Sequence, residues 1–393
     1  MVPLDKLNNF ETIYLGFSGG LDSCVLLHLL SQNESIQKKL VAVHINHGLS
    51  PEADNWTTWT EQVCKASGVM YKTFSVKLDT KKNLEESARK KRYAIFEHLL
   101  KSAKDILLLA HHQNDQAETV LLHLFRGAGV DGLAAMPKYR ALGKGHLYRP
   151  LLGVSREDLR HYAIEKKLEW VEDHSNQDNH FDRNFLRNEI IPQLQKRWPS
   201  LVANLSRSAE NCAVVRKKIK PMIESQLSTM VDERHRLSIH LLVQESRDTQ
   251  MMLLRSWLEK QHFKKPSRHS LQRVLDELIP APIDASPLVA WNEGEIRRYQ
   301  GLLYALKREQ EVLEPSILLA PFLKDAQTRV EIRYRQGGEK IRLSGKTRDL
   351  KKLFQLWKIP PWERHKIPLI YVNDVLTSVY GWATCDELKL DKL

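Results

Sequence analysis

The sequence has few cysteines and no long apolar run, and each absence narrows the class of protein. Only four cysteines occur in 393 residues, Cys24, Cys64, Cys212 and Cys385, and none forms a CxxC pair. This spacing argues against a zinc knuckle or a redox pair and indicates scattered reduced thiols. No apolar stretch approaches the roughly 18 residues that a membrane helix needs. No basic region followed by an apolar stretch opens the chain, so we expect no signal peptide and a cytoplasmic location.

Acidic residues are in the minority, and the basic excess is unevenly distributed. The chain carries 60 Lys and Arg against 48 Asp and Glu, a net charge of +12. Residues 1–200 hold 27 basic and 24 acidic side chains, whereas residues 201–393 hold 33 and 24, so most of the excess is C-terminal. An apolar content of 42% and a charged content of 27% are ordinary for a folded chain and exclude disordered, collagenous and coiled-coil proteins.

Short apolar runs alternate with helical stretches in the first 125 residues. The runs at 12–17, 39–45, 70–76 and 106–110 predict strands, and the stretches at 24–30, 52–67, 85–103 and 116–125 predict helices. This alternation is typical of parallel strands joined by crossover helices. We therefore expect an α/β fold whose N-terminal domain has a Rossmann-like parallel sheet.

The expected secondary structure changes twice in the rest of the chain. At about 150 residues per domain, the length suggests two or three domains. Helical patterns dominate from residue 156 to 230, prolines break up residues 266–287, and β-branched and basic residues prevail from 327. The expected domains are 1–220, a mostly helical small domain at 221–315, and an α+β domain at 316–393.

Residues Ser18, Gly19, Gly20, Leu21, Asp22 and Ser23 form a loop between the first expected strand and helix. Backbone N–H groups at a helix N-terminus favour an anion, and two glycines let phosphate approach closely. The two serines add hydroxyl donors, and Asp22 is the loop residue able to hold Mg²⁺ or a cationic partner. The loop therefore predicts a pyrophosphate site, although SGG also occurs in ordinary turns.

Three similar patterns do not fit their usual context. Residues 16–20 match G-x-S-x-G, the nucleophile elbow of α/β-hydrolases, but no earlier strand-helix loop is present to complete an oxyanion hole. Residues 127–132 match G-x-G-x-x-G, but they follow a helix rather than a strand. Residues 345–347 resemble the end of a Walker A loop, but Lys340 stands where its first glycine is required.

Acidic and histidine side chains gather after the fourth expected strand. Asp115 and Glu118 are three residues apart, which puts both carboxylates on one helix face and suits an ammonium or a metal. A solvated helix N-terminus is the alternative explanation, and we favour the functional one. His111 and His112 close the strand, where open parallel sheets bind ligands, and we assign them no zinc. Arg89 and Arg92 suit helix ion pairs or a role near nucleotide or RNA.

The SGGLDS loop resembles the PP-loop of the N-type ATP pyrophosphatases, and later motifs narrow the resemblance. The segments at 44–49, 83–89, 110–119, 149–152 and 183–187 resemble the tRNA(Ile)-lysidine synthetase family. The tail segments at 337–339, 350–353 and 359–364 are similar to that family's C-terminal domain. The resemblance covers nearly the whole chain. One departure is Asn114, where the family usually has an acid beside Asp115.

The resemblance implies a ligase that uses ATP and Mg²⁺ to adenylate C2 of cytidine 34 in a tRNA(Ile) with a CAU anticodon. Lysine then joins to give lysidine, and AMP and pyrophosphate leave. It implies an ATP-binding loop at Ser18–Ser23 and catalytic roles for Asp22, Asp115 and Glu118, with Asp22 and Asp115 as magnesium ligands. Residues 1–220 would be catalytic, 221–315 substrate-binding and 316–393 tRNA-binding.

The tail combines positive charge with aromatic residues. Between Arg333 and Lys366 there are 11 basic and 3 acidic side chains, with Tyr334, Phe354, Trp357 and Trp362 among them. Such a segment suits a phosphate backbone and unpaired bases. The tRNA contacts that we expect are Arg183, Arg187, Arg335, Lys351, Lys352 and Arg364. The sequence leaves the oligomeric state open, with a homodimer as one option.

Two alternatives remain at this point. Another PP-loop enzyme such as a tRNA thiolase would share adenylation, but sulfur delivery normally requires paired or motif-placed cysteines, which are absent. A non-catalytic tRNA-binding protein that senses ATP would form no product. Replacing Asp22 separates an enzyme from such a binding module, because only the enzyme has an adenylation step to lose.

Overall fold

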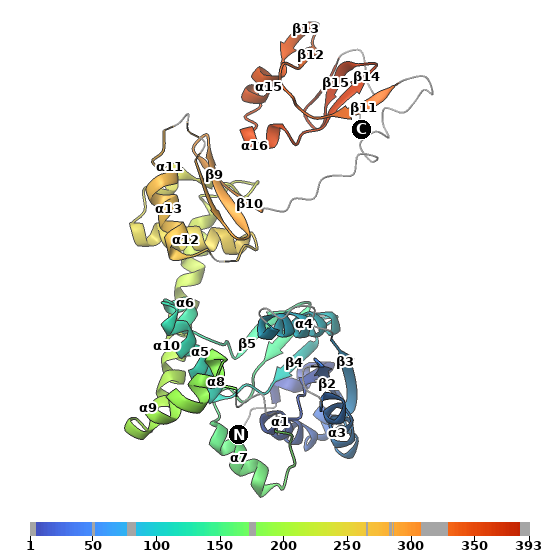
Figure 1. The fold of residues 1–393 in the computed structure, drawn as a ribbon, viewed down its shortest axis with the longest axis vertical. Helices are drawn as coiled ribbons and strands as arrows, with labels where there is room; N and C mark the ends of the chain where they lie inside the picture. Colours follow the sequence, from blue (N-terminus) through green and yellow to red (C-terminus); the bar gives the residue numbers. More distant parts are fainter. Residues whose placement is uncertain are drawn as a thin grey trace. The chain divides into compact units, whose positions relative to one another are not determined.

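The computed structural model describes residues 5–48, 52–76, 84–172, 178–264, 266–282, 285, 287–307 and 329–385. It divides into two compact units, Met1–Pro221 and Met222–Leu393, shown in Figure 1. The division falls inside helix α10 (Leu201–Ser228), next to the boundary expected at residue 220. The second expected boundary, at 315–316, lies outside the described residues.

Unit 1 is built on a six-stranded sheet in the order β3-β2-β1-β4-β6-β5. Five strands are parallel: β1 (Thr12–Gly16), β2 (Leu40–Asn46), β3 (Met70–Ser75), β4 (Asp105–Leu109) and β6 (Gly145–Tyr148). Strand β5 (Tyr139–Leu142) pairs antiparallel with β6. The four expected parallel strands are confirmed. The β5–β6 hairpin was not expected, because each of its strands has only four residues and no continuous apolar run.

Helices cover both faces of this sheet, which explains why its strands are apolar without interruption. Leu40 and Ala42 of β2 pack with α1 (Leu21–Ser31), α3 (Ala53–Ala66) and α7 (Arg156–Glu165). Val41 and Val43 point the other way and pack with Phe96 of α4 (Leu84–Leu99). Figure 1 shows α4 on one side of the sheet and α1 and α3 on the other. Because successive side chains of a strand point to opposite faces of the sheet, each strand contributes to the hydrophobic cores on both faces.

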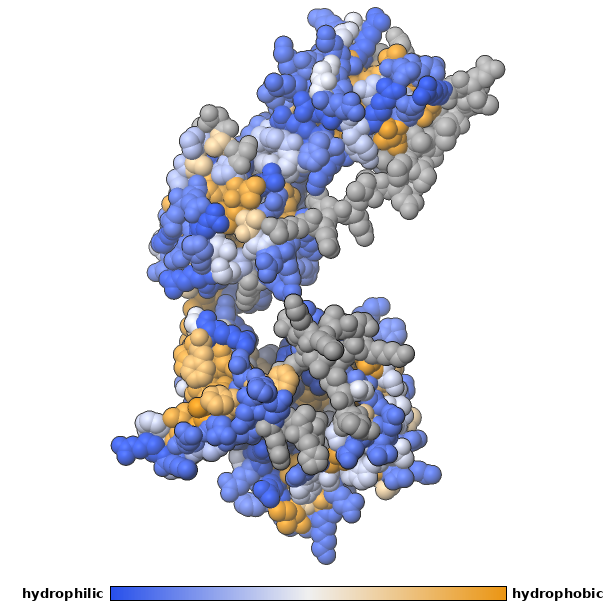
Figure 2. Space-filling view, in the orientation of Figure 1, coloured by the Kyte–Doolittle hydropathy of each residue, from blue (hydrophilic) through white to orange (hydrophobic). Residues whose placement is uncertain are grey.

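A second helical layer follows the sheet. It comprises α5 (Gln113–Phe125), α6 (Val130–Leu133), α8 (Asp182–Phe185), a π-helical turn (Leu186–Ile190), α9 (Ile191–Arg197) and α10. Ala117, Leu121 and Leu186 belong to its small core. Apolar side chains remain exposed at the end of α5 and along α10, and Figure 2 shows an orange region over this part of unit 1.

The first part of unit 2 packs helices against a small sheet. Helices α11 (Ile239–Leu242), α12 (Arg247–Lys260) and α13 (Arg268–Arg273), followed by a π-helical turn (Val274–Leu278), agree with the helical expectation. An antiparallel sheet in the order β7-β10-β9-β8 was not foreseen. Its strands are β7 (Leu237–Ser238), β8 (Leu288–Trp291), β9 (Gly294–Tyr299) and β10 (Leu302–Lys307). The prolines before residue 288 hid the start of these short strands.

The last part of unit 2 is α+β, as expected, and has a core of its own. One sheet has the order β11-β14-β15-β16, with β11 (Val330–Arg333), β14 (Leu369–Val372), β15 (Val375–Val379) and β16 (Ala383–Thr384). A hairpin of β12 (Lys340–Leu343) and β13 (Lys346–Asp349) precedes helices α15 (Leu350–Leu356) and α16 (Pro361–Arg364). Across the described ranges, we find no helix with the length and apolarity to cross a membrane.

Candidate active site

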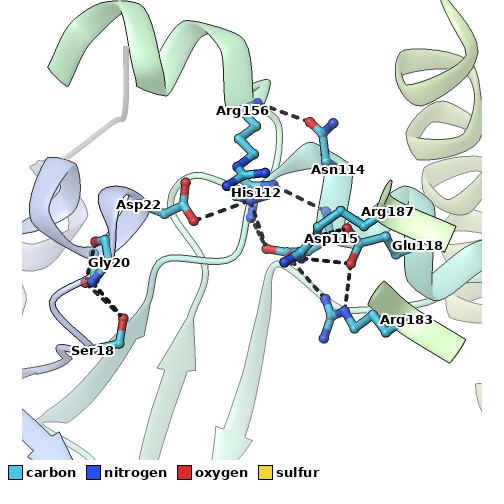
Figure 3. Close-up of polar contacts among 11 residues, drawn as sticks. Ser18, Gly20, Asp22, His112, Asn114, Asp115, Glu118, Arg156, Arg183 and Arg187 are labelled. Atoms are coloured by element: carbon cyan, nitrogen blue, oxygen red, sulfur yellow. Dashed lines mark hydrogen bonds and ion pairs between the residues drawn. The ribbon is translucent and has the colours of Figure 1, made fainter. Parts of the chain in front are cut away.

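The loop between β1 and α1 has a conformation that its own residues fix. Gly19 has a φ of +83°, which favours glycine, and a Cβ there would lie 2.8 Å from Thr60 Cγ2. The Ser23 hydroxyl accepts from the Gly19 N–H at 3.1 Å and donates to the Gly20 carbonyl at 2.9 Å. Figure 3 shows the Gly20 N–H directed at the Ser18 hydroxyl, 3.3 Å away. The loop is thus shaped before any ligand binds.

Helix α1 begins at the end of this loop with no side-chain cap on its first N–H groups. Such groups have no partner inside the helix, and the helix dipole favours an anion beside them. Ser18, Asp22 and Ser23 border a cavity of about 760 Å³. The start of α1 is therefore suited to the phosphates of a ligand bound in this cavity.

The cavity lies at the carboxyl ends of β1, β2 and β4, where open parallel sheets bind ligands. Its volume is within the range of small-molecule sites. Its walls come from the end of β2, from α4 and from the start of α5, and include His47, Arg89, Arg92, Tyr93 and His111. Both arginines whose role the sequence left open therefore face the ligand space.

Asp22, in the first turn of α1, has a carboxylate with one unused oxygen. Its Oδ2 lies 3.5 Å from Nε2 of His112, whereas its buried Oδ1 has no hydrogen-bond partner among the described residues. A buried polar atom without a partner is costly unless a ligand, ion or water satisfies it. Mg²⁺ binds through one or two carboxylates together with substrate phosphates. Asp22 therefore fits the expected magnesium ligand, although no cluster of three metal-ligating side chains occurs in the described part.

His112 is buried between the start of α5 and Asp22. Its Nδ1 accepts from the Asp115 N–H at 3.3 Å, and Asp115 Oδ2 accepts from the His112 N–H at 3.0 Å, which makes a capping box. Burial lowers the pKa of His112, but the hydrogen bond to Asp22 and the charge of Asp115 outweigh burial and raise the pKa above its ordinary value. His112 thus couples the phosphate loop to the acids of α5.

Two arginines bind the acids of α5, as Figure 3 shows. Arg183 Nε lies 2.7 Å from Glu118 Oε2, and Arg187 Nε lies 2.7 Å from Glu118 Oε1. The Nη2 atoms of Arg183 and Arg187 lie 2.9 and 3.0 Å from Asp115 Oδ1. Burial raises the pKa of Asp115, but His112 and Arg183 outweigh burial and hold that pKa below its usual range. The four side chains form one charged network with the acids enclosed.

This network limits what the two acids can bind. Asp115 Oδ1 accepts from two guanidinium groups and Oδ2 accepts from the His112 N–H, so the expected magnesium role of Asp115 does not fit the geometry. The Glu118 side chain is 1% exposed, and both of its oxygens contact arginines. Arg183 and Arg187, expected to contact tRNA, point inward to these acids.

Asn114, the departure from the family pattern, lies beside the network but serves another element. Its Oδ1 accepts from the backbone N–H of Arg156 at 3.1 Å, which links α5 to the start of α7. Asn114 is not among the residues that line the cavity. Its position therefore indicates a structural role rather than a role in metal binding.

The expected tRNA-contact residues of the tail differ in exposure. Lys351 and Lys352 are exposed at the start of α15. Arg335 Nε lies 3.9 Å from Glu339 Oε2, and Arg364 Nε donates to the Ile359 carbonyl at 2.9 Å. The two lysines are therefore the most accessible cations of this set.

The aromatic residues of the tail divide in the same way. Phe354 and Trp362 are buried, and Phe354 belongs to the core of this part of unit 2. They are therefore unsuited to the base stacking considered for them. Tyr334 is 38% exposed, which leaves its ring accessible.

Sequence reasoning placed Arg149 in the family-like segment 149–152 but gave it no role in the site. This side chain is 2% exposed and reaches from the end of β6 to the ring of His111, with Nε 3.2 Å from Nδ1. An arginine directly after a short apolar strand was the available signal. The β5–β6 hairpin that places it was not predicted, so its contact with His111 could not be foreseen.

Comparison with known protein families gives matches along most of the chain. A PP-loop domain matches residues 3–194, a TilS substrate binding domain matches residues 237–304, and a TilS substrate C-terminal domain matches residues 330–392. The matched ranges contain the phosphate loop, the small sheet of unit 2 and the basic tail.

Curated relatives align over nearly the full length. A tRNA(Ile)-lysidine synthase of Legionella pneumophila (strain Paris) is 41% identical over 97% of this chain and 93% of the relative. A tRNA(Ile)-lysidine synthase of Coxiella burnetii is 39% identical over 98% and 91%. Among solved structures, the U34-tRNA thiolase NcsA from Methanococcus maripaludis is 20% identical over 53% of this chain and 74% of its own, with a TM-score of 0.45. That last likeness is too weak to bear on activity.

Proposed function

The chain belongs to the tRNA(Ile)-lysidine synthase family, and on that premise we propose that it joins lysine to the wobble cytidine of an isoleucine tRNA with a CAU anticodon. It is an ATP-dependent ligase that modifies a tRNA wobble base. The observation that carries the finer proposal is the uncapped start of α1, which opens onto a cavity bordered by Asp22. A tRNA substrate also favours the expected cytoplasmic location.

Adenylation comes first in the proposed reaction. The C2 carbonyl oxygen of cytidine 34 attacks the α-phosphate of ATP, and pyrophosphate leaves from the Ser18–Ser23 loop. Asp22 Oδ1 would hold Mg²⁺, which when bound neutralises charge on the phosphates. Loop N–H groups and the α1 dipole favour the leaving anion. Catalysis in this step rests on positioning and electrostatics.

Lysine attack completes the reaction. The ε-amine adds to C2, the C2–O bond breaks, and AMP leaves with the oxygen. The amine must be neutral to attack, so a carboxylate is needed to accept its proton. Asp22 borders the cavity through the oxygen assigned above to Mg²⁺, whereas Asp115 and Glu118 bind Arg183 and Arg187. We therefore propose that Asp22 contacts the reactants and that Asp115 and Glu118 act by positioning the two arginines.

Unit 2 is proposed to bind the tRNA body. Residues 221–315 would form a substrate-binding domain, and residues 316–393 a tRNA-binding domain. The basic excess at Arg333–Lys366 and the exposure of Lys351 and Lys352 support this division. A homodimer also stays a prediction, to be checked by light scattering on the purified protein.

The cysteines support a ligase over a thiolase. Burial raises the pKa of both Cys24 and Cys64 to about 12, so neither supplies a thiolate at neutral pH. Cys385 is buried as well, and Cys212 of α10 is the one partly exposed thiol among the described residues. Sulfur delivery normally requires paired or motif-placed cysteines, and a single partly exposed thiol provides neither, which disfavours a thiolase. Transfer of an amine requires neither.

The direct test is incubation of the protein with ATP, radiolabelled lysine and transcribed tRNAs. Label should enter the tRNA(Ile) with a CAU anticodon and not a tRNA(Ile) with a GAU anticodon, with AMP and pyrophosphate released in equal amounts. The Asp22→Asn variant should bind the tRNA but release no pyrophosphate. Product formation by this variant at the wild-type rate, or label in neither tRNA, would overturn the proposal.

A further inference from the structure

His111 stands at the carboxyl end of β4, the strand next to β1 and its phosphate loop. The ring lines the cavity, and its hydrogen bond to Arg149 uses Nδ1, so Nε2 lies on the opposite side of the ring. Its position beside the phosphate loop puts it where the acceptor substrate must meet ATP. The chemical form of this ring therefore matters for what the cavity can recognise.

Arg149 fixes that form. Its Nε donates to His111 Nδ1 at 3.2 Å, and its Nη1 donates to the Pro137 carbonyl at 2.7 Å. A guanidinium has no acceptor and stays protonated in proteins, so Nδ1 can only be the acceptor of this contact. A neutral imidazole that accepts at Nδ1 carries its proton on Nε2. The proton of His111 therefore points to the side of the ring away from Arg149.

The surroundings keep the ring neutral. Arg149 is 2% exposed, and it also donates hydrogen bonds to the Pro137 carbonyl and the Tyr93 hydroxyl. These contacts hold its guanidinium beside Nδ1 of His111. A protonated ring would put an N–H against the Arg149 N–H. Burial lowers the pKa of His111 to about 3, in agreement with this hydrogen-bonding argument. His111 thus acts as a hydrogen-bond donor with one fixed direction at any physiological pH.

We propose that Arg149 locks His111 as an Nε2–H donor, and that this donor binds N3 of the cytosine that is modified. The proposal rests on the proposed function. The cytosine must bring O2 to the ATP phosphates at α1, and N3 flanks the same C2 atom. N3 of cytosine is an acceptor, whereas N3 of uracil carries a proton. A donor that cannot reverse its polarity therefore selects cytosine over uracil.

The same contact assists the amine addition. When a nucleophile adds to C2, electron density moves onto the ring nitrogens, N3 among them. A donor already aimed at N3 stabilises that density without reorganisation, because its tautomer is set before substrate binds. His111 would then contribute both to recognition of the base and to the second chemical step. Arg149 is a positioning residue, since it acts through the ring.

A matched pair of variants tests whether His111 acts as a fixed Nε2–H donor. Glutamine places an amide near the position of imidazole Nε2, so His111→Gln keeps a donor toward the cavity. Asparagine places an oxygen near Nδ1, so His111→Asn keeps an acceptor for Arg149 but loses the cavity donor. We expect His111→Gln to keep kcat/KM for the tRNA within about tenfold, and His111→Asn to lose about 100-fold. A purely structural role for His111 predicts the reverse order.

A substrate lacking the acceptor identifies the contacted atom. A tRNA with 3-deazacytidine at position 34 has C–H in place of N3. The wild-type enzyme should modify it about 10- to 100-fold more slowly than the normal tRNA, whereas His111→Asn should treat the two tRNAs alike. ATP affinity, measured without tRNA, should be the same in all three proteins.

The outcomes are separable. If His111→Asn loses as much activity on the deaza substrate as wild type does, His111 does not contact N3 and the proposal is wrong. A selective rise of the KM for ATP or lysine in His111→Asn would assign the donor to another ligand and also overturn it. Failure of wild type to form lysidine on normal tRNA would instead remove the proposed function.

Discussion

At the scale of single residues, the enclosed acid Glu118 is the most sensitive charge of the site. Its 1% exposed side chain contacts Arg183 and Arg187, each at 2.7 Å. Removing one partner of a buried ion pair leaves charge uncompensated, at a cost of about 3–5 kcal/mol. Glu118→Gln should therefore lower the free energy of unfolding by about 3 kcal/mol, measured by urea denaturation at pH 7.

A matched control exists on the surface. Glu34 pairs with Lys38 at 2.7 Å, and both side chains are more than 70% exposed. Exposed pairs contribute at most about 1 kcal/mol, so Glu34→Gln should have an effect below about 0.5 kcal/mol. Equal effects of the two substitutions would show that the Glu118 network is not enclosed in solution.

His111 gives the stability a pH dependence whose sign follows from its lowered pKa. The unfolded imidazole binds a proton below about pH 6.5, whereas the folded ring does so only near pH 3. Its contribution is therefore present above pH 6.5 and is lost as the pH falls toward 3. Between pH 7 and pH 5 the loss should be about 2 kcal/mol.

The measurement compares wild type with His111→Gln by denaturation at both pH values. Burial also lowers the pKa of His44 and His47, but these residues titrate in both proteins and cancel in the difference. Wild type should lose about 2 kcal/mol more than the variant. The same pH slope in both proteins would refute the assignment to His111.

At the scale of secondary-structure elements, Asn114 ties two helices together. Its side-chain oxygen accepts the N–H of Arg156, the first residue of α7. An aspartate can accept the same hydrogen bond and gains from the dipole at the start of α5. Asn114→Asp should therefore keep activity and leave stability unchanged or higher by up to about 1 kcal/mol.

The Asn114→Ala variant, compared with Asn114→Asp, tests the hydrogen bond between α5 and α7. It removes the acceptor, so stability should fall by about 1 kcal/mol while kcat at saturating substrates stays near that of wild type. Thermal denaturation and the lysine-labelling assay check the two quantities. A large loss of kcat in both variants would place Asn114 in the reaction rather than in the α5–α7 contact.

At the scale of the whole molecule, enclosed charge and net positive charge lie in different parts of the chain. The enclosed charges lie in unit 1, whereas most of the basic excess lies in the C-terminal half of the chain. Phosphate contacts by lysine release counterions, and each such contact steepens the salt dependence of binding. A double substitution of Lys351 and Lys352 by alanine should weaken tRNA binding and reduce the slope of log K against log salt by about 2.

The control for this pair is Lys38→Ala, which removes an exposed lysine directly after the short helix α2 (Glu34–Gln37) in unit 1. Filter binding at several salt concentrations should show no change in its slope. The kcat of the double variant at saturating tRNA should equal that of wild type, because the role proposed for the two lysines is tRNA binding and not catalysis. A changed kcat with an unchanged slope would contradict the assignment.

Local patterns made several features predictable. The four parallel strands and the phosphate loop could be read from apolar runs and from the position of two glycines, because those signals lie within a few residues. For the small domain the sequence predicted only a mostly helical character, with which helices α12 and α13 agree. The β5–β6 hairpin and the sheet of β8, β9 and β10 were not predictable, since their short strands carry little local signal and form only through pairing partners.

The sequence by itself determined the α/β class, the loop that opens α1 and the chemistry that its residue types allow. These follow from local propensity and from spacing along the chain. Only the tertiary structure decided that Arg183 and Arg187 enclose Asp115 and Glu118, that Asp22 keeps a free oxygen, and that Arg149 sets the proton of His111. These relations join residues 38 to 72 positions apart, and side-chain geometry across such distances arises only when the sheet edge and the helices around it have packed.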